Sequence, residues 1–76
     1  MNKWRRKEIE SIIEALESVK MRVDDVSEEE ADYRDNIPEN LMGSERYEKA
    51  DDAVSNLEEA LECLENALEY LEDAME

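Results

Sequence analysis

The sequence predicts an all-α protein. Two long helices form an antiparallel coiled-coil hairpin, and two hairpins dimerise into a four-helix bundle. Three observations predict this fold class. Two segments repeat apolar residues at alternating steps of three and four, which is the spacing of a coiled-coil seam. A short connector between them holds the only Pro and the only Gly of the chain. The second segment also carries a row of Ala that widens its apolar face beyond what one neighbouring helix covers.

The first helix is predicted over residues 3–34. Its apolar residues keep the coiled-coil spacing except at Glu30, where a carboxylate takes a seam position. We therefore expect the seam residues to face the second helix. They are Ile9, Ile12, Leu16, Val19, Val23, Val26 and Tyr33.

The connector is predicted over residues 35–43. Pro38 cannot continue a helix and restricts the residue before it, so the first helix ends ahead of this point. Asn36 is expected to close that helix in the left-handed conformation. Ser44 is a good N-cap for the second helix, and Glu45 places a negative charge in its first turn, where the helix dipole favours one.

Three apolar connector residues, Ile37, Leu41 and Met42, are expected to cover the open end of the seam. Because the connector is short and the two helices are of similar length, the helices should pack antiparallel. The whole chain, residues 1–76, is then a single helical-hairpin domain.

The second helix is predicted over residues 44–75. Its seam has no interruption and consists of Ala50, Val54, Leu57, Leu61, Leu64, Leu68, Leu71 and Met75. A row of small residues at seven-residue intervals flanks the seam, and small residues let another helix approach closely. We expect the chain to form a homodimer through this part of the helix. The predicted self-association residues are Ala53, Leu57, Ala60, Leu61, Leu64, Ala67, Leu68 and Leu71.

Charge placement also favours the antiparallel hairpin. The first seven residues carry four cations and no acid. In a hairpin folded about position 39 or 40, Lys3, Arg5, Arg6 and Lys7 would lie beside Glu72, Asp73 and Glu76. The same fold predicts three further contacts, which are Lys20 with Glu59, Arg34 with Glu45, and Lys49 with Glu30. Exposed pairs of this kind contribute under about 1 kcal/mol each, so they set orientation more than stability.

The composition excludes most chemistry. The chain has no His, which removes the usual general base and most zinc sites, so we expect no catalytic residue, no metal site and no cofactor. Its net charge of −15 argues against direct binding of nucleic acid or of an anionic membrane. The single Cys63 and the lack of an apolar signal or membrane-spanning stretch favour a cytoplasmic protein. The sequence therefore predicts a non-enzymatic protein.

Carboxylates dominate the second helix. Residues 50–76 contain ten of them and no Lys, Arg or His. This density favours a basic protein partner, most simply a nucleic-acid-binding protein that the chain inhibits as a nucleic-acid mimic. The predicted partner-binding residues are Glu58, Glu62, Glu65, Glu69, Glu72, Asp73 and Glu76. The alternative is a structural or assembly adaptor that acts through its apolar seam, with acidity serving only solubility.

Trp4 lies among the cations of the first turn. We expect its ring to pack over the open end of the hairpin, and the alternative is an anchor for a partner protein or a membrane interface. Cys63 has carboxylate neighbours, which disfavour a reactive thiolate, so we expect it to be a structural residue on the flank of the seam.

Three stretches suggest a relationship to known proteins. They are Arg5-Arg-Lys-Glu-Ile, the connector Asn36-Ile-Pro-Glu-Asn-Leu-Met-Gly-Ser-Glu-Arg-Tyr, and the Leu-Glu-x-Ala repeats. Together they resemble small uncharacterised acidic helical proteins of phages and prophages of low-GC Gram-positive bacteria. The resemblance implies an accessory protein of a mobile element that counters host defence. It implies no catalytic or binding residue.

Overall fold

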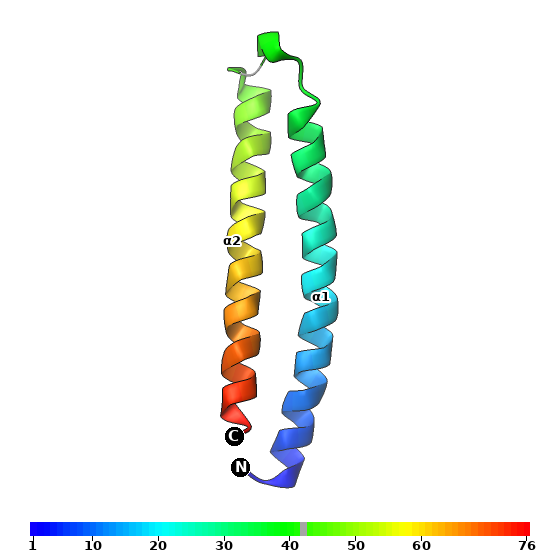
Figure 1. The fold of residues 1–76 in the computed structure, drawn as a ribbon, viewed down its shortest axis with the longest axis vertical. Helices are drawn as coiled ribbons and strands as arrows, with labels where there is room; N and C mark the ends of the chain where they lie inside the picture. Colours follow the sequence, from blue (N-terminus) through cyan, green and yellow to red (C-terminus); the bar gives the residue numbers. More distant parts are fainter. Residues whose placement is uncertain (42) are drawn as a thin grey trace.

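The computed structural model describes residues 1–41 and 43–76. Helix α1 (Lys3–Asp35) is followed by a short 3₁₀ turn, η1 (Glu39–Leu41), and by helix α2 (Glu45–Ala74). The two helices lie side by side and antiparallel, with both chain ends at one end of a rod of 59 × 15 × 13 Å (Figure 1). The predicted all-α antiparallel hairpin is confirmed.

The helix ends are fixed by short polar contacts. The Oγ of Ser44 accepts a hydrogen bond from the backbone N–H of Tyr47 (3.3 Å), and Glu45 lies in the first turn of α2, so both expectations are confirmed. Asn2, which was not identified from the sequence, caps α1 by accepting from the N–H of Arg5 (2.8 Å). The expectation for Asn36 was wrong, because its φ of −91° is right-handed. Its side-chain amide instead closes α1 by donating to the carbonyl of Asp32 (2.7 Å).

The buried core is small. Ile37 is buried and covers the connector end of the hairpin as expected, whereas Leu41 is exposed, so that expectation was wrong. Met42 lies outside the described residues. The buried apolar side chains are Ile13, Ile37, Ala50, Val54 and Leu68. A two-helix hairpin has only one contact strip per helix, which limits how many side chains it buries.

The seam of α1 differs from the prediction on one flank. Ile9, Leu16 and Val23 are half-buried against α2 as expected. However, the row that joins them consists of Ile13, Lys20, Ser27 and Arg34. The predicted row of Ile12, Val19, Val26 and Tyr33 is exposed by 39%, 40%, 50% and 45%. The polar row can lie inside because Lys and Arg pack their aliphatic stems on the seam while their charged ends reach its rim.

Two ion pairs define the register of the hairpin. Lys20 Nζ lies 3.1 Å from Glu65 Oε1, and Arg34 Nη1 lies 2.9 Å from Asp51 Oδ1. The two residue numbers sum to 85 in both pairs. In each pair, the acidic partner on α2 lies six residues after the partner that the sequence predicted. The predicted contacts of Lys20 with Glu59 and of Arg34 with Glu45 were therefore wrong.

The third predicted contact, between Lys49 and Glu30, also does not form among the described residues. Lys49 instead pairs within its own helix, with Glu45 at 3.0 Å. A partner one helical turn away is always within reach, whereas the register moves Glu30 away from Lys49.

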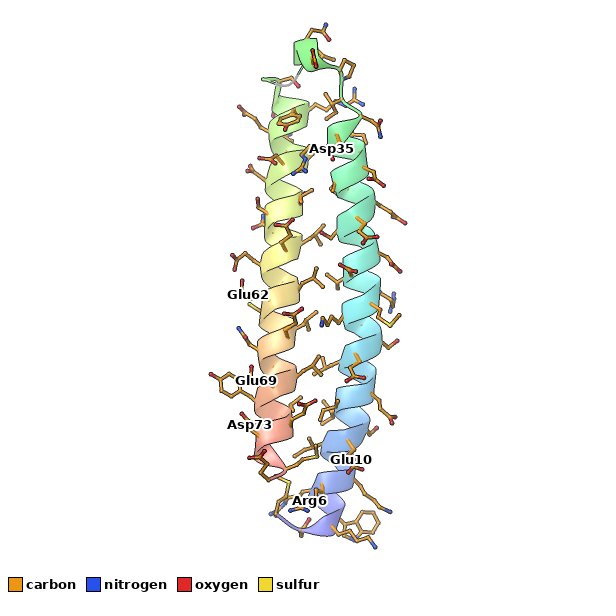
Figure 2. All side chains as sticks on the ribbon, in the orientation of Figure 1. Arg6, Glu10, Asp35, Glu62, Glu69 and Asp73 are labelled. Carbon is orange, nitrogen blue, oxygen red and sulfur yellow. The ribbon has the colours of Figure 1, made fainter. Side chains whose placement is uncertain are left out.

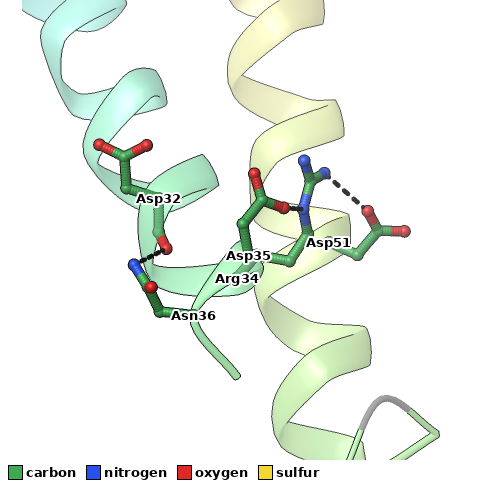
Figure 3. A network of polar contacts seen from close by, with 5 residues as sticks. All are labelled: Asp32, Arg34, Asp35, Asn36 and Asp51. Carbon is green, nitrogen blue, oxygen red and sulfur yellow. Dashed lines mark hydrogen bonds and ion pairs between the residues drawn. The ribbon is translucent and has the colours of Figure 1, made fainter. Parts of the chain in front are cut away.

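Arg34 joins the two helices near the connector (Figure 3). Its guanidinium donates to Asp35 (3.1 Å) and to Asp51 (2.9 Å). These hydrogen bonds raise the pKa of Arg34 above its ordinary value. Because arginine is already charged at any working pH, this shift adds no pH dependence to stability.

The first turn of α1 extends past the end of α2 (Figure 1). In the observed register, residue 9 is level with Glu76, so residues 3–7 have no helix beside them. In the described part of the chain their cations form no ion pair with Glu72, Asp73 or Glu76, and that prediction was wrong. Trp4 is 83% exposed, so it does not cover the end of the hairpin as expected.

Ser27 gives a test of the polar row, since it is the buried polar residue of the core. We expect Ser27→Ala to raise the free energy of unfolding by about 0.5–1.5 kcal/mol. Alanine has the higher helix propensity, and at a position that is only 6% exposed its methyl group replaces a polar side chain. Ser18→Ala is the matched control, because Ser18 lies on the exposed side of the same helix and gains only the propensity. Urea unfolding of the two variants measures the difference, and equal gains would contradict a buried position for Ser27.

Candidate protein-binding surfaces

The hairpin has two different sides, each with a shallow groove between the helices. On one side, the groove is lined mainly by charged residues from both helices. We call it the charged groove, and its lining residues are Glu17, Lys20, Met21, Asp24, Leu61, Glu65 and Leu68. On the other side, a second groove is lined by Val19, Arg22, Val23, Val26 and Leu57, and we call it the apolar groove. Successive helical residues point about 100° apart, so Val19 and Lys20 leave the seam toward opposite sides.

The second side carries two apolar rows, which together we call the apolar face. The row on α1 is Ile12, Val19, Val26 and Tyr33, and the row on α2 is Ala53, Ala60, Ala67 and Ala74. The Ala row leaves α2 on the flank of Leu57 opposite to Leu61, which places it above the apolar groove.

A contact at the connector end confirms that the two rows share one side. The Nε of Arg46 donates to the Tyr33 hydroxyl (2.7 Å), and its guanidinium lies 5.3 Å from the centre of the Tyr33 ring. Arg46 is seven residues before Ala53 and therefore belongs to the same row of α2.

The carboxylates of α2 are confined to one part of its circumference. One strip of 13 positions contains no carboxylate, whereas the other 17 residues of the helix contain all 11 of its acids. The strip comprises positions 46, 49, 50, 53, 56, 57, 60, 63, 64, 67, 70, 71 and 74. The acid-free strip includes the Ala row, which is the α2 half of the apolar face.

The seven residues predicted to bind a partner are all exposed. We call this set the carboxylate surface: Glu58, Glu62, Glu65, Glu69, Glu72, Asp73 and Glu76. Figure 2 shows Glu62, Glu69 and Asp73 along the side of α2 that points away from α1. Glu65 is at the rim of the charged groove, where it pairs with Lys20. The structure thus brings these residues onto one continuous surface of α2.

The predicted self-association residues divide between the two sides. Leu68 is buried against α1, and Leu61 lines the charged groove. Leu57 lines the apolar groove, and Leu64 and Leu71 are half-buried seam residues. Ala60 is exposed on the apolar face, with Ala53 and Ala67 half-buried beside it.

The row of Ile12, Val19, Val26 and Tyr33 was not identified as a surface from the sequence. All four residues were assigned to the seam, because they are apolar and keep its spacing. A signal was nevertheless present, since this row repeats every seven residues as the Ala row of α2 does.

Other features of the described residues offer little chemistry. Cys63 is a free, exposed thiol. No three His, Cys, Asp or Glu side chains within residues 1–41 and 43–76 gather closely enough to hold a metal ion. Within the same ranges, neither helix has an apolar stretch of the length that crosses a bilayer.

Comparison of the chain with protein-family models, with curated proteins and with solved structures finds no match.

Proposed function

We propose that the chain is a non-enzymatic protein-binding module whose carboxylate surface blocks a basic, nucleic-acid-binding surface of a host protein. The division of charge on α2 carries this proposal, because all 11 acids of the helix lie outside one continuous acid-free strip. A solubilising role requires only net charge, which carboxylates scattered around the helix also supply.

The spacing of the charges suits such a role. Ten carboxylates in residues 50–76 extend over about 40 Å of helix, or about one charge per 4 Å. A single DNA strand carries one phosphate per ~3.4 Å. A groove that neutralises phosphates with Lys and Arg would therefore meet a similar line of negative charge on α2.

The resemblance to phage and prophage proteins fits an accessory protein of a mobile element. Such a protein would act in the cytoplasm of the host and would target a nucleic-acid-binding or defence protein there. No direct contact with nucleic acid or with a membrane is part of this proposal, because the net charge of −15 repels both.

Neutralising four carboxylates tests the proposal. We expect the variant Glu58→Gln, Glu62→Gln, Glu65→Gln and Glu69→Gln to lose at least about tenfold in affinity, since each lost charge pair is worth up to ~1 kcal/mol. DNA-binding proteins of the host are first captured on the immobilised wild-type chain. Displacement of labelled DNA from each captured protein is then measured for the wild type and the variant, at low and high salt.

The matched control neutralises four exposed carboxylates of α1, namely Glu10, Glu14, Glu17 and Glu28. It changes the net charge equally but leaves the carboxylate surface intact. Equal losses in both variants would mean that only net charge matters. Undiminished DNA displacement by the α2 variant would contradict the proposal directly.

A structural or assembly adaptor is the second candidate, and the exposed row of Ile12, Val19, Val26 and Tyr33 favours it. Such a protein acts through apolar contacts, including self-association into a homodimer, and its acidity serves solubility. Ionic strength separates the two candidates. Binding through carboxylates weakens steeply as salt rises, whereas binding through apolar contacts barely changes.

A further inference from the structure

The apolar face is built as a ladder in which each rung has one large residue and one Ala. In the register that the ion pairs define, a residue of α1 is level with the residue of α2 for which the two numbers sum to about 85. The four rungs are Ile12 with Ala74, Val19 with Ala67, Val26 with Ala60, and Tyr33 with Ala53. Along the whole ladder, the large side chains of α1 therefore project further from the apolar face than the Ala side chains of α2.

The hairpin exposes more surface than a monomer of its mass normally does. Its accessible surface is 5931 Å², whereas a compact 8.9 kDa monomer has about 4800 Å². The excess of about 1100 Å² exceeds the ~800 Å² that each partner buries in a stable interface of standard size. A single further hairpin on the apolar face would therefore cover most of this excess at an interface of standard size.

The distribution of charge favours a second copy of this chain as the partner that covers the apolar face. The acid-free strip of α2 lies here, so this is the side on which two chains of net charge −15 approach with the least repulsion. A strongly basic partner would instead be drawn to the carboxylate surface. Shape also favours an identical chain as the partner. The row of large residues on α1 and the row of Ala on α2 have the same seven-residue period, so the large row of one copy fits against the Ala row of another.

We infer that a second copy of this chain covers the apolar face, in a dimer whose two-fold axis runs along the hairpin. In this arrangement α1 of each copy lies against α2 of the other. Each large residue of one copy then packs on the Ala at the same level of the other copy, so all four rungs interlock twice. The four helices form a bundle in which every neighbour is antiparallel.

The chain ends are compatible with this orientation. The first turn of α1, with Lys3, Arg5 and Arg6, has no helix beside it in the single hairpin. In the dimer its cations project at the same end of the bundle as the acidic terminus of α2 in both copies, so opposite charges alternate around that end.

The reverse orientation fits less well. A two-fold axis across the hairpin would place α1 against α1 of the second copy, with large residues facing large residues. Ala would then face Ala, and the two pairs of helices would need different separations. This orientation would also bring the acid-free strips of the two α2 helices together, and with them the two exposed Cys63 thiols at its edge.

The oligomeric state of the purified chain tests the inference. The inference rests on the self-association proposed above and gives that dimer a specific geometry. The experiment needs no other protein, so neither result supports or contradicts the proposed role of the carboxylate surface. We expect the wild type to sediment at twice 8.9 kDa at micromolar concentration. Val19→Asp with Val26→Asp should halve that mass and keep the helical circular dichroism, since both side chains are already exposed in the hairpin.

The control variant is Ser18→Asp with Met21→Asp. It adds the same number of charges to the same helix, at exposed positions outside the apolar face, and it should remain dimeric. A folded wild-type monomer would overturn the inference. So would a dimer that survives Val19→Asp with Val26→Asp.

Cross-linking tests the orientation and does not depend on the stability of the charged variants. Two chains, each with Cys63→Ser, carry either Val19→Cys or Ala67→Cys and are mixed before mild oxidation. We expect the disulfide between position 19 of one chain and position 67 of the other to predominate. Predominance of links between identical chains, or a wild-type dimer linked through Cys63, would overturn the proposed orientation.

Discussion

Replacing Leu68 with Ala is expected to lower the free energy of unfolding by about 2–5 kcal/mol, the range for removing a large apolar side chain from a packed core. Leu68 is 9% exposed and is one of only five buried apolar residues in the described part of the chain. A hairpin has no second layer that can close the resulting cavity. Chemical unfolding monitored by circular dichroism should show a lower midpoint or no cooperative transition.

Met21→Ala is the control for this experiment. It removes the same number of side-chain atoms from a residue that is 70% exposed on the same side of the hairpin. We expect a change within about 0.5 kcal/mol, as for most surface substitutions. Similar losses in the two variants would mean that Leu68 is not part of the core that the structure shows.

Neutralising the carboxylate surface should have the opposite effect on stability. Glu58→Gln, Glu62→Gln, Glu65→Gln and Glu69→Gln together remove six like-charge pairs at helical spacings of three or four, which cost about 0.2–0.5 kcal/mol each. The ion pair of Glu65 with Lys20 is lost, at under about 1 kcal/mol. We expect a net gain of about 1–2 kcal/mol and a rise in Tm of about 4–8 °C per kcal/mol.

Salt provides the control for this prediction. Added salt screens repulsion between exposed charges, so it should stabilise the wild type more than the neutralised variant and bring the two Tm values together. A variant that is less stable than the wild type at low salt would contradict the repulsion. A gain in stability would also show that any loss of partner binding by this variant is not caused by unfolding.

The sequence predicted the α2 half of the hairpin well and the α1 half only partly. Ala50, Val54 and Leu68 are buried as the α2 seam required, because only one strip of that helix is apolar enough to be covered. On α1, two rows flank the same central positions. Sequence reasoning chose the apolar row that includes Val19, whereas the structure covers the polar row that includes Lys20.

The candidate surfaces were predicted to a similar degree. The exposure of the carboxylate surface followed from helical periodicity alone, since acids off the seam of a two-helix protein have no element to cover them. The apolar face of α1 was missed for a related reason. Periodicity shows which residues share a side of a helix, but it does not show how many neighbouring helices are available to cover that side.

By itself, the sequence determined the two helices, their connector, the Ser44 cap and the acidic outer surface of α2, because each depends on local spacing and on backbone preferences. Only the tertiary structure decided the register and the covered flank of α1. A seven-residue repeat is compatible with several registers and with either flank of its central row. The choice between them depends on particular long-range contacts, such as Arg34 with Asp51, which local spacing does not encode.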